Sequence, residues 1–275
     1  MSHPLAPPKD PSLLLRFERR FGLGPASDPR ERLRRLARAF AHLPYENLTK
    51  IIKLSSTGSP ALARRPPAEV IEDHERFGAG GTCFSLTAAL LHLVRAAGFR
   101  AEPLLADRRY GPDTHCAIRV EIDGRPHLLD PGYLLDRPVE LPRQSPLAVA
   151  GAGQGLSLEP LPDGRRVELA SYAGGARRVR MIFKIEPADE AQFLRAWDES
   201  FFWEAMRYPV VTAVRGGRHL YLQGNRLQER DRGGTRRREI GPDEIASRIA
   251  RDFGISPAVA TRALSALRSA GERHG

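Results

Sequence analysis

The stretch GAGGTCFSLTAALLHLVRAAG, residues 78–98, places a cysteine where a glycine-rich loop becomes a helix. Three glycines among its first four residues allow the loop to turn sharply and to approach other groups closely. Thr82 offers an N-cap hydroxyl, and the residues from Cys83 to Ala97 favour a helix and include no proline. Apolar residues on nearly every side predict that this helix is buried. Because the positive end of a helix dipole lowers the pKa of a thiol, Cys83 is a candidate nucleophile.

The composition is ordinary for a globular protein, with 41% apolar and 28% charged residues among 275. There is no apolar run of about 18 residues and no signal-peptide pattern, so we expect a cytoplasmic protein without a membrane partner. Two cysteines, Cys83 and Cys116, predict free thiols rather than a disulfide framework. The net charge is +10, but only four of the 43 basic residues are lysines, a bias typical of GC-rich genomes. No DNA- or RNA-binding motif accompanies them, and we expect no nucleic-acid partner.

The period of the apolar residues divides the chain into three parts. Helical spacing dominates residues 1–98, period-two alternation follows over 99–186, and a helix, short strands and two terminal helices occupy 187–275. We therefore predict an α+β protein with an N-terminal helical bundle, a central antiparallel β-barrel and a C-terminal α/β domain. The expected helices cover 10–21, 28–42, 67–77, 83–97 and 187–206; the segment 44–50 is expected to be irregular; the expected strands cover 101–106, 115–122, 125–130, 156–160, 165–172, 177–186, 210–214 and 219–223.

One β-hairpin can be given a register from the sequence alone. The pair Asp123-Gly124 is a strong signal for a two-residue turn between alternating strands. With that turn, Ala117 lies opposite Asp130 and on the same face. His115, two residues further along the strand, shares this face and is the diagonal neighbour of Asp130, at roughly 7 Å or less between Cβ atoms. An aspartate can bond an imidazole across that distance.

A cysteine at a helix N-terminus and a histidine–aspartate pair supply the parts of a nucleophilic thiol site. Cys83 would attack a carbonyl, His115 would accept and return its proton, and Asp130 would hold the imidazole tautomer. Cys116 and His127 point to the other face of the hairpin and are not part of this hypothesis. The structural alternatives are that Cys83 is a small core residue, that His115 is a strand histidine with its hydrogen bonds made, and that Asp130 only forms a turn.

Other kinds of site have less support. The eight histidines show no paired ligand spacing, so we expect no metal. The glycines lack the Lys-Ser/Thr of a phosphate loop. The cluster 236–238, three arginines, could contact the phosphates of a nucleotide-like cofactor, although no single cofactor-binding residue can be assigned. The aromatic cluster Trp197, Phe201, Phe202 and Trp203 either packs in the core or lines an acceptor pocket.

At this point the chain resembles the arylamine N-acetyltransferases. The resemblance rests on LPYENL (43–48), GGTCF (80–84), the isolated His115 and DPG (130–132), in the order Cys, His, Asp. It implies a helical bundle, a β-barrel and an α/β lid, and the catalytic residues Cys83, His115 and Asp130. It also implies ping-pong transfer of an acetyl group from acetyl-coenzyme A through a Cys83 thioester to an arylamine or hydrazine. Transglutaminase-like cysteine enzymes share this order of residues.

The sequence departs from the family pattern around these motifs. Family members usually have Arg, Glu and Asn where this chain has Ala79, Ser85 and Thr87, and Val-Gly-Phe-Gly where it has the residues from Pro131 to Leu134. Two other hypotheses therefore stay open. One is an amide synthase or transglutaminase-like thiol hydrolase with a donor other than coenzyme A, and the other is a non-catalytic small-molecule-binding relative. The acceptor amine, the acyl chain and the oligomeric state are not specified by the sequence.

Overall fold

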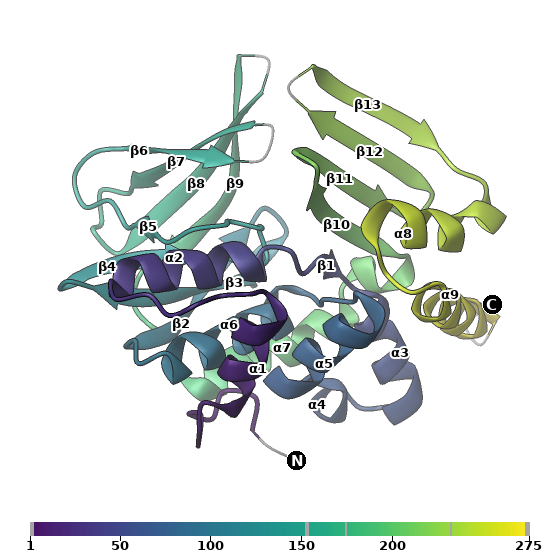
Figure 1. Cartoon of the computed structure of the whole chain (residues 1–275). Helices are drawn as coiled ribbons and strands as arrows, with labels where there is room; N and C mark the ends of the chain where they lie inside the picture. Colours follow the sequence, from purple (N-terminus) through teal and green to yellow (C-terminus); the bar gives the residue numbers. More distant parts are fainter. Residues whose placement is uncertain (1–2, 152–153, 174, 232, 273–275) are drawn as a thin grey trace.

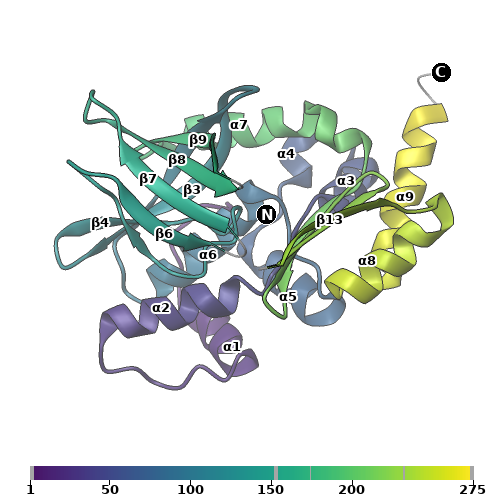
Figure 2. The same ribbon diagram turned by 90° about the horizontal axis from the view of Figure 1, so that it is seen from above.

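The computed structural model describes residues 3–151, 154–173, 175–231 and 233–272. Two antiparallel sheets stand side by side over a helical layer, and the chain passes from the helices to the larger sheet and then to the smaller one (Figure 1). Seen from above, helices α8 and α9 lie on the outer side of the smaller sheet (Figure 2). The α+β class, with bundle, barrel and α/β part in the predicted order, is confirmed. The domain boundaries at 98 and 186 stay predictions.

The N-terminal part is helical, as expected, and its capping residues act partly as the sequence suggests. Asp28 caps α2 by accepting a hydrogen bond from the backbone N–H of Arg30. Thr82 is the N-cap residue of α6, but its hydroxyl makes no capping bond. Helix α6 is buried along most of its length, and α1, α2 and α5 pack around it. The helices are α1 Ser12–Arg20, α2 Pro29–Phe40, α3 Leu48–Thr57, α4 Pro60–Ala63, α5 Pro67–Phe77 and α6 Cys83–Ala96.

The larger sheet has eight strands in the order β5-β4-β3-β2-β9-β8-β7-β6 and curls into the predicted barrel-like shape (Figure 1). The turn at Asp123 and Gly124 gives the predicted register, with Ile118 opposite Leu129. Both turn residues have positive φ, as a two-residue hairpin turn of this kind requires. The strands are β2 Ala101–Arg108, β3 Gly111–Ile122, β4 Arg125–Leu129, β5 Val139–Glu140, β6 Leu147–Gly151, β7 Gln154–Pro160, β8 Arg166–Ala173 and β9 Ala176–Lys184.

The smaller sheet has five strands in the order β1-β10-β11-β12-β13. Its edge strand β1, Tyr45–Glu46, comes from the helical part of the sequence and pairs with β10. The other strands are β10 Val210–Arg215, β11 Arg218–Gln223, β12 Arg226–Asp231 and β13 Gly234–Glu239, and the helices that follow are α8 Ile245–Phe253 and α9 Pro257–Glu272. The sequence did not predict strands β12 and β13. Strand β13 is exposed throughout, and β12 has one buried residue, Leu227, so neither shows an apolar alternation.

Two expectations about local structure are wrong for tertiary reasons. The segment 44–50 is not irregular: it forms β1 and the first turn of α3, because residues distant in the sequence supply its partners. Asn47 bonds the backbone carbonyls of Ala205 and Tyr208 instead of its own neighbourhood. The helix expected at 187–206 is α7, Glu190–Glu199, which gives way to two 3₁₀ turns. Between these turns Trp203 is extended, with φ −67° and ψ 149°.

Three apolar clusters hold these parts together. The first joins the N-terminal helices, α7 and the outer face of the barrel strands, and it includes both cysteines. The second lies between the smaller sheet, α8, α9 and α3. The third fills the inside of the barrel. Cys83 and its helix belong to the first cluster, whereas Ala79, four residues before Cys83, belongs to the second.

Candidate active site

Cys83 lies at the first turn of α6, as the sequence predicts, and is only 1% exposed. Its loop approaches other backbone closely: a Cβ on Gly80 would lie 1.8 Å from the carbonyl oxygen of Pro44. One on Gly81 would lie 2.2 Å from Oγ of Ser85, whose hydroxyl donates to the Thr82 carbonyl at 3.2 Å. The contact at Gly80 is with backbone and excludes any side chain there, whereas a side chain at position 81 would first have to displace the Ser85 hydroxyl. Gly80 is therefore required by space, and it holds the loop that leads into the helix and its cysteine against Pro44.

His115 and Asp130 meet as the hairpin register predicts. Nε2 of His115 lies 2.8 Å from Oδ2 of Asp130, and both side chains are fully buried. The other carboxylate oxygen of Asp130 accepts the backbone N–H of Tyr133 at 2.8 Å. Asp130 thus orients the imidazole and also bonds the turn that follows, so it is the turn-forming aspartate of the structural alternative as well as the partner of His115. The ring of His115 packs edge-on against Phe183 inside the barrel.

Gly132 shows how closely Cys83 and His115 approach. A Cβ built on this glycine would lie 2.8 Å from Cβ of Cys83 and 2.9 Å from Cε1 of His115. It would also lie 3.1 Å from Cα of Cys83. One methyl group would therefore collide with both side chains at once. The structure thus brings Cys83 and His115 together at Gly132, the glycine of the DPG motif, and Asp130 joins them through its bond to His115.

The electrostatics distinguish the two thiols. The pKa of Cys83 is well below its usual value, first because of a hydrogen bond with the thiol of Cys116 and then because of His115 and the charge of Arg108; burial opposes the shift. Burial raises the pKa of Cys116. For His115 burial opposes protonation, but the charge and hydrogen bond of Asp130 outweigh it and raise the pKa. These shifts favour a Cys83 thiolate and, whenever Nδ1 of His115 is free to carry a proton, an imidazolium beside it.

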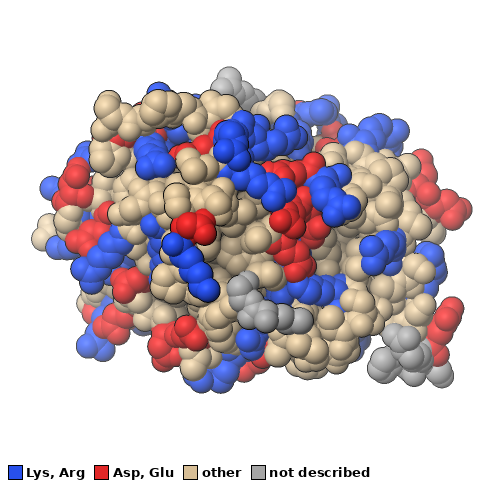
Figure 3. Space-filling view, turned by 60° about the horizontal axis from the view of Figure 1, so that its bottom comes forward, with Lys and Arg blue, Asp and Glu red and all other residues tan. Residues whose placement is uncertain are grey.

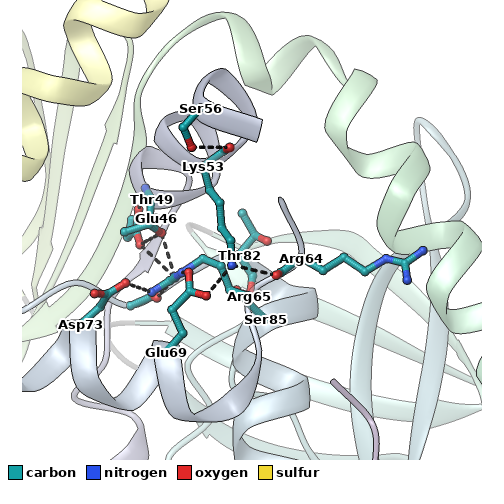
Figure 4. Close-up of polar contacts among 11 residues, drawn as sticks. Glu46, Thr49, Lys53, Ser56, Arg64, Arg65, Glu69, Asp73, Thr82 and Ser85 are labelled. Carbon is teal, nitrogen blue, oxygen red and sulfur yellow. Dashed lines mark hydrogen bonds and ion pairs between the residues drawn. The ribbon is translucent and has the colours of Figure 1, made fainter. Parts of the chain in front are cut away.

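A buried arginine from the connection between α4 and α5 holds the glycine loop in place. Arg65 lies just before α5, is 2% exposed, and donates to the carbonyl of Gly80 at 2.5 Å and to Oγ1 of Thr49 at 2.8 Å. Its other terminal nitrogen contacts Asp73 at 2.7 Å. The fully buried carboxylate of Glu46 lies 3.9 Å from the guanidinium, as drawn in Figure 4. Arg65 therefore ties the loop, α3 and α5 together.

The packing around Ala79 bears on one departure from the family pattern. Ala79 is fully buried and packs into the second apolar cluster, so a longer charged side chain would not fit there. The guanidinium that contacts the glycine loop comes instead from Arg65, 14 positions earlier. Nothing in the sequence pointed to Arg65, because its contacts join segments that are separate along the chain.

Arg108 is the second residue that sequence reasoning missed. It ends β2, and its Nη2 lies 2.8 Å from Nδ1 of His115. Strand β2 pairs with β3 so that Ala106 is opposite His115, and a bulge after Ala106 changes the alternation at Arg108. A β2–β3 hairpin could have been suspected from the glycine and proline at 111–112, but the bulge could not have been placed.

An open cleft of about 1370 Å³ lies between the two sheets and reaches the site. Gly132, Arg108, Tyr45 and Trp203 line it, whereas Cys83 lies beneath this lining. Its lining contains eight arginines and two acidic residues: Arg38, Arg108, Arg109, Arg137, Arg178, Arg180, Arg230, Arg237, Asp136 and Glu204. By contrast, acidic side chains lie among the basic ones over the face drawn in Figure 3. The cleft is thus suited to an anion.

The aromatic cluster of the sequence divides between its two expected roles. Trp197 and Phe201 are buried, and Trp197 stacks on Phe84 of α6. Trp203 lines the cleft, and Phe202 is 78% exposed. Of the arginine cluster at 236–238, Arg237 lines the cleft.

Within the described ranges, no three His, Cys, Asp or Glu side chains are grouped so that they could hold a metal ion. The helices in these ranges also include none with the length and apolar character needed to cross a membrane.

The sequence matches no family model and no curated protein. Solved structures do resemble it. The arylamine N-acetyltransferase from Mycobacterium abscessus superposes with a TM-score of 0.79 at 21% identity, covering 93% of this chain and 94% of that one. The Mycobacterium marinum enzyme in complex with CoA gives 0.76 at 18% identity over 92% and 98%, and that of Nocardia farcinica gives 0.71 at 22% over 94% and 97%. The chain therefore has the fold of the arylamine N-acetyltransferases, as the sequence motifs implied.

Proposed function

We propose that this protein is an N-acyltransferase of the arylamine N-acetyltransferase type, with Cys83, His115 and Asp130 as its catalytic residues. The observation that carries the proposal is the convergence of Cys83 and His115 on Gly132, with Asp130 bonded to the far side of the imidazole. The lowered pKa of Cys83 supports a catalytic thiol over a purely structural one.

In the first half-reaction, the Cys83 thiolate attacks the carbonyl carbon of the acyl donor thioester. The negative charge that develops on the carbonyl oxygen lies at the N-terminal end of α6, where backbone N–H groups and the helix dipole stabilise an anion. As the tetrahedral intermediate collapses, the bond to the donor sulfur breaks. The imidazolium of His115 protonates the departing thiolate, and the acyl group stays on Cys83 as a thioester.

In the second half-reaction, a neutral amine attacks the Cys83 thioester. His115, now neutral, accepts the proton that the amine nitrogen loses, and Cys83 departs as the thiolate. Asp130 stabilises the imidazolium in both halves and fixes its proton on Nε2. The products are an amide and the regenerated thiolate–imidazolium pair.

Coenzyme A is the donor carrier that the cleft supports best. Its phosphate groups need cations, and arginine binds phosphate oxygens in a bidentate manner. The cleft offers eight arginines against two acidic side chains, and Arg137 already pairs with one of these, Asp136. The fold neighbour from Mycobacterium marinum is in complex with CoA. We infer an acetyl-coenzyme A substrate and no metal.

An aromatic or hydrazine-type amine is the acceptor class we propose. Trp203, Tyr45 and Tyr208 line the cleft and can stack on a planar ring.

The test is to incubate the protein with acetyl-coenzyme A and to measure its intact mass. We expect a gain of one acetyl group, lost in Cys83→Ala and kept in Cys116→Ser, a control that removes the other buried thiol but leaves a hydroxyl that can donate to the Cys83 sulfur. Adding an arylamine should discharge the acetyl group. An unmodified protein with no release of coenzyme A would contradict the donor assignment. Rapid alkylation of Cys83 by iodoacetamide without acetylation would favour the alternative of an amide synthase or thiol hydrolase with another donor.

A further inference from the structure

Arg108 stands between the cleft and the proposed catalytic histidine. Its side chain lines the cleft, and its Nη2 contacts Nδ1 of His115 at 2.8 Å. Because a guanidinium can only donate, Nδ1 accepts this bond, and the single ring proton lies on Nε2 toward Asp130. Nδ1 is therefore occupied in this structure, and Arg108 has to leave it before His115 can take a proton there.

The guanidinium has few other partners. Its Nε is buried and has no hydrogen-bond partner among the described residues. Nη1 has only a long contact of 3.5 Å with the hydroxyl of Tyr110. The acidic residues nearest in sequence, Asp107 and Asp113, both pair with Lys184, at 3.1 and 2.5 Å. Within the described part of the chain, Arg108 has no carboxylate partner.

Arg108 is half-buried, and the negative charge near it is the Cys83 thiolate, which is lost when Cys83 is acylated. A guanidinium left in a cleft without a counter-charge, and with an Nε that has no partner in the described ranges, is expected where a ligand supplies the charge. The shape of the guanidinium matches a carboxylate, which can accept from Nε and one Nη at once. The place is also specific: the guanidinium contacts Nδ1, the ring nitrogen that does not bond Asp130, and the ring of His115 and Cys83 meet at Gly132. A partner of Arg108 would therefore lie close to the acylated sulfur. The phosphates of a donor carrier have the other arginines that line the cleft as partners.

We propose that Arg108 binds a carboxylate carried by the substrate beside the reacting carbonyl. This inference rests on the function proposed above and narrows its substrate class. The carboxylate belongs either to the acyl group, as in the malonyl or succinyl thioester of coenzyme A, or to the acceptor, as in an aminobenzoate. When the carboxylate takes the guanidinium, Nδ1 of His115 is released for proton transfer, so binding of the right substrate also frees the base.

The experiment compares donors and acceptors on the same protein. Acylation of Cys83 is followed by mass and by coenzyme A release with acetyl-, malonyl- and succinyl-coenzyme A, using one neutral amine. The acyl enzyme is then discharged with aniline and with aminobenzoate isomers. Each rate constant is measured for the wild type, Arg108→Met and Arg108→Lys. The matched control is Arg109→Met, because Arg109 carries the same charge, lines the same cleft and is exposed, but does not contact His115.

We expect the wild type to prefer the carboxylate-bearing substrate either among the donors or among the acceptors. The set in which the preference appears shows whether the carboxylate belongs to the acyl group or to the acceptor amine. In Arg108→Met the preference, expressed as a ratio of kcat/KM values, should fall by about 10- to 100-fold, the range for one charge-assisted pair. Arg108→Lys should keep part of the preference, and Arg109→Met should keep all of it. Because the ratio is taken within each variant, a partly unfolded sample does not alter it.

The proposal is overturned if the wild type shows no preference in either arm, or if Arg109→Met lowers the preference as much as Arg108→Met does. Failure of the proposed function looks different: no thioester of coenzyme A would then acylate Cys83 at all.

Discussion

Gly132→Ala is expected to separate the two reacting side chains without removing either. The new Cβ would lie 2.8 Å from Cβ of Cys83, 2.9 Å from Cε1 of His115 and 3.1 Å from Cα of Cys83. Non-bonded carbon atoms approach favourably at about 3.5–4.0 Å, so these neighbours must give way by roughly 0.5–1 Å. Since Cys83 is fixed by the first turn of α6 and His115 by its bond to Asp130, the methyl group forces their sulfur and imidazole apart.

Two quantities should respond. Overpacking in a buried site lowers the free energy of unfolding by about 1–3 kcal/mol. A displacement of about 1 Å between reacting groups lowers the rate by about 100-fold. Stopped-flow alkylation of Cys83 and acetyl transfer would measure the rate, and thermal unfolding would show that the variant is still folded at the assay temperature.

Gly24→Ala is the matched control, since a Cβ there meets nothing within 4 Å and its φ is not positive. It should leave both measurements unchanged. If Gly132→Ala keeps the wild-type alkylation and transfer rates while folded, the close approach of Cys83 and His115 described above is wrong.

Three further substitutions test other parts of the structure. Asp130→Asn keeps an oxygen that can accept the Tyr133 N–H but turns an amide donor toward His115, so the ring proton moves to Nδ1. The kcat of acyl transfer should fall about 10²–10⁴-fold, while circular dichroism should show little loss of folded protein. Arg65→Met leaves the buried Glu46 without its cation and should lower the free energy of unfolding by about 3–5 kcal/mol in urea titrations. Lys50→Met should flatten the dependence of the free energy of unfolding on pH at alkaline pH. Burial lowers the pKa of Lys50 from 10.5 to about 7, so between these values the unfolded chain binds one more proton than the folded chain. The stability of the wild type therefore rises with pH there, by up to about 1.4 kcal/mol per pH unit.

Each of these has an outcome that would contradict it. Wild-type transfer by Asp130→Asn would remove Asp130 from the mechanism. Arg64→Met is the control for Arg65, because the ion pair of Arg64 with Asp198 is partly exposed and should contribute less. Equal losses in the free energy of unfolding for Arg64→Met and Arg65→Met would show that the buried contacts of Arg65 stabilise the protein no more than a partly exposed ion pair does. A Lys50→Met variant with the same slope as the wild type above pH 7 would show that Lys50 titrates normally in the folded protein.

The predictable part of the site is the part held by local structure. A two-residue turn determines every pairing in the hairpin that follows it, so Asp123 and Gly124 were sufficient to place His115 beside Asp130. Glycines followed by an uninterrupted apolar helix were sufficient to place Cys83 at a buried helix N-terminus. These patterns span a few residues and depend little on the rest of the chain.

The tertiary structure alone decided how these local pieces meet. Strand β1 pairs with β10, more than 160 residues later in the chain. Arg65 contacts the glycine loop from the connection between α4 and α5. A bulge in β2 directs Arg108 toward His115. The sequence by itself thus determined where the proposed catalytic side chains lie on their own elements, because short-range backbone geometry assigns each of them a face. Only the folded chain decided what surrounds them, because packing and buried charge pairing join residues whose separation along the chain leaves no periodic signal.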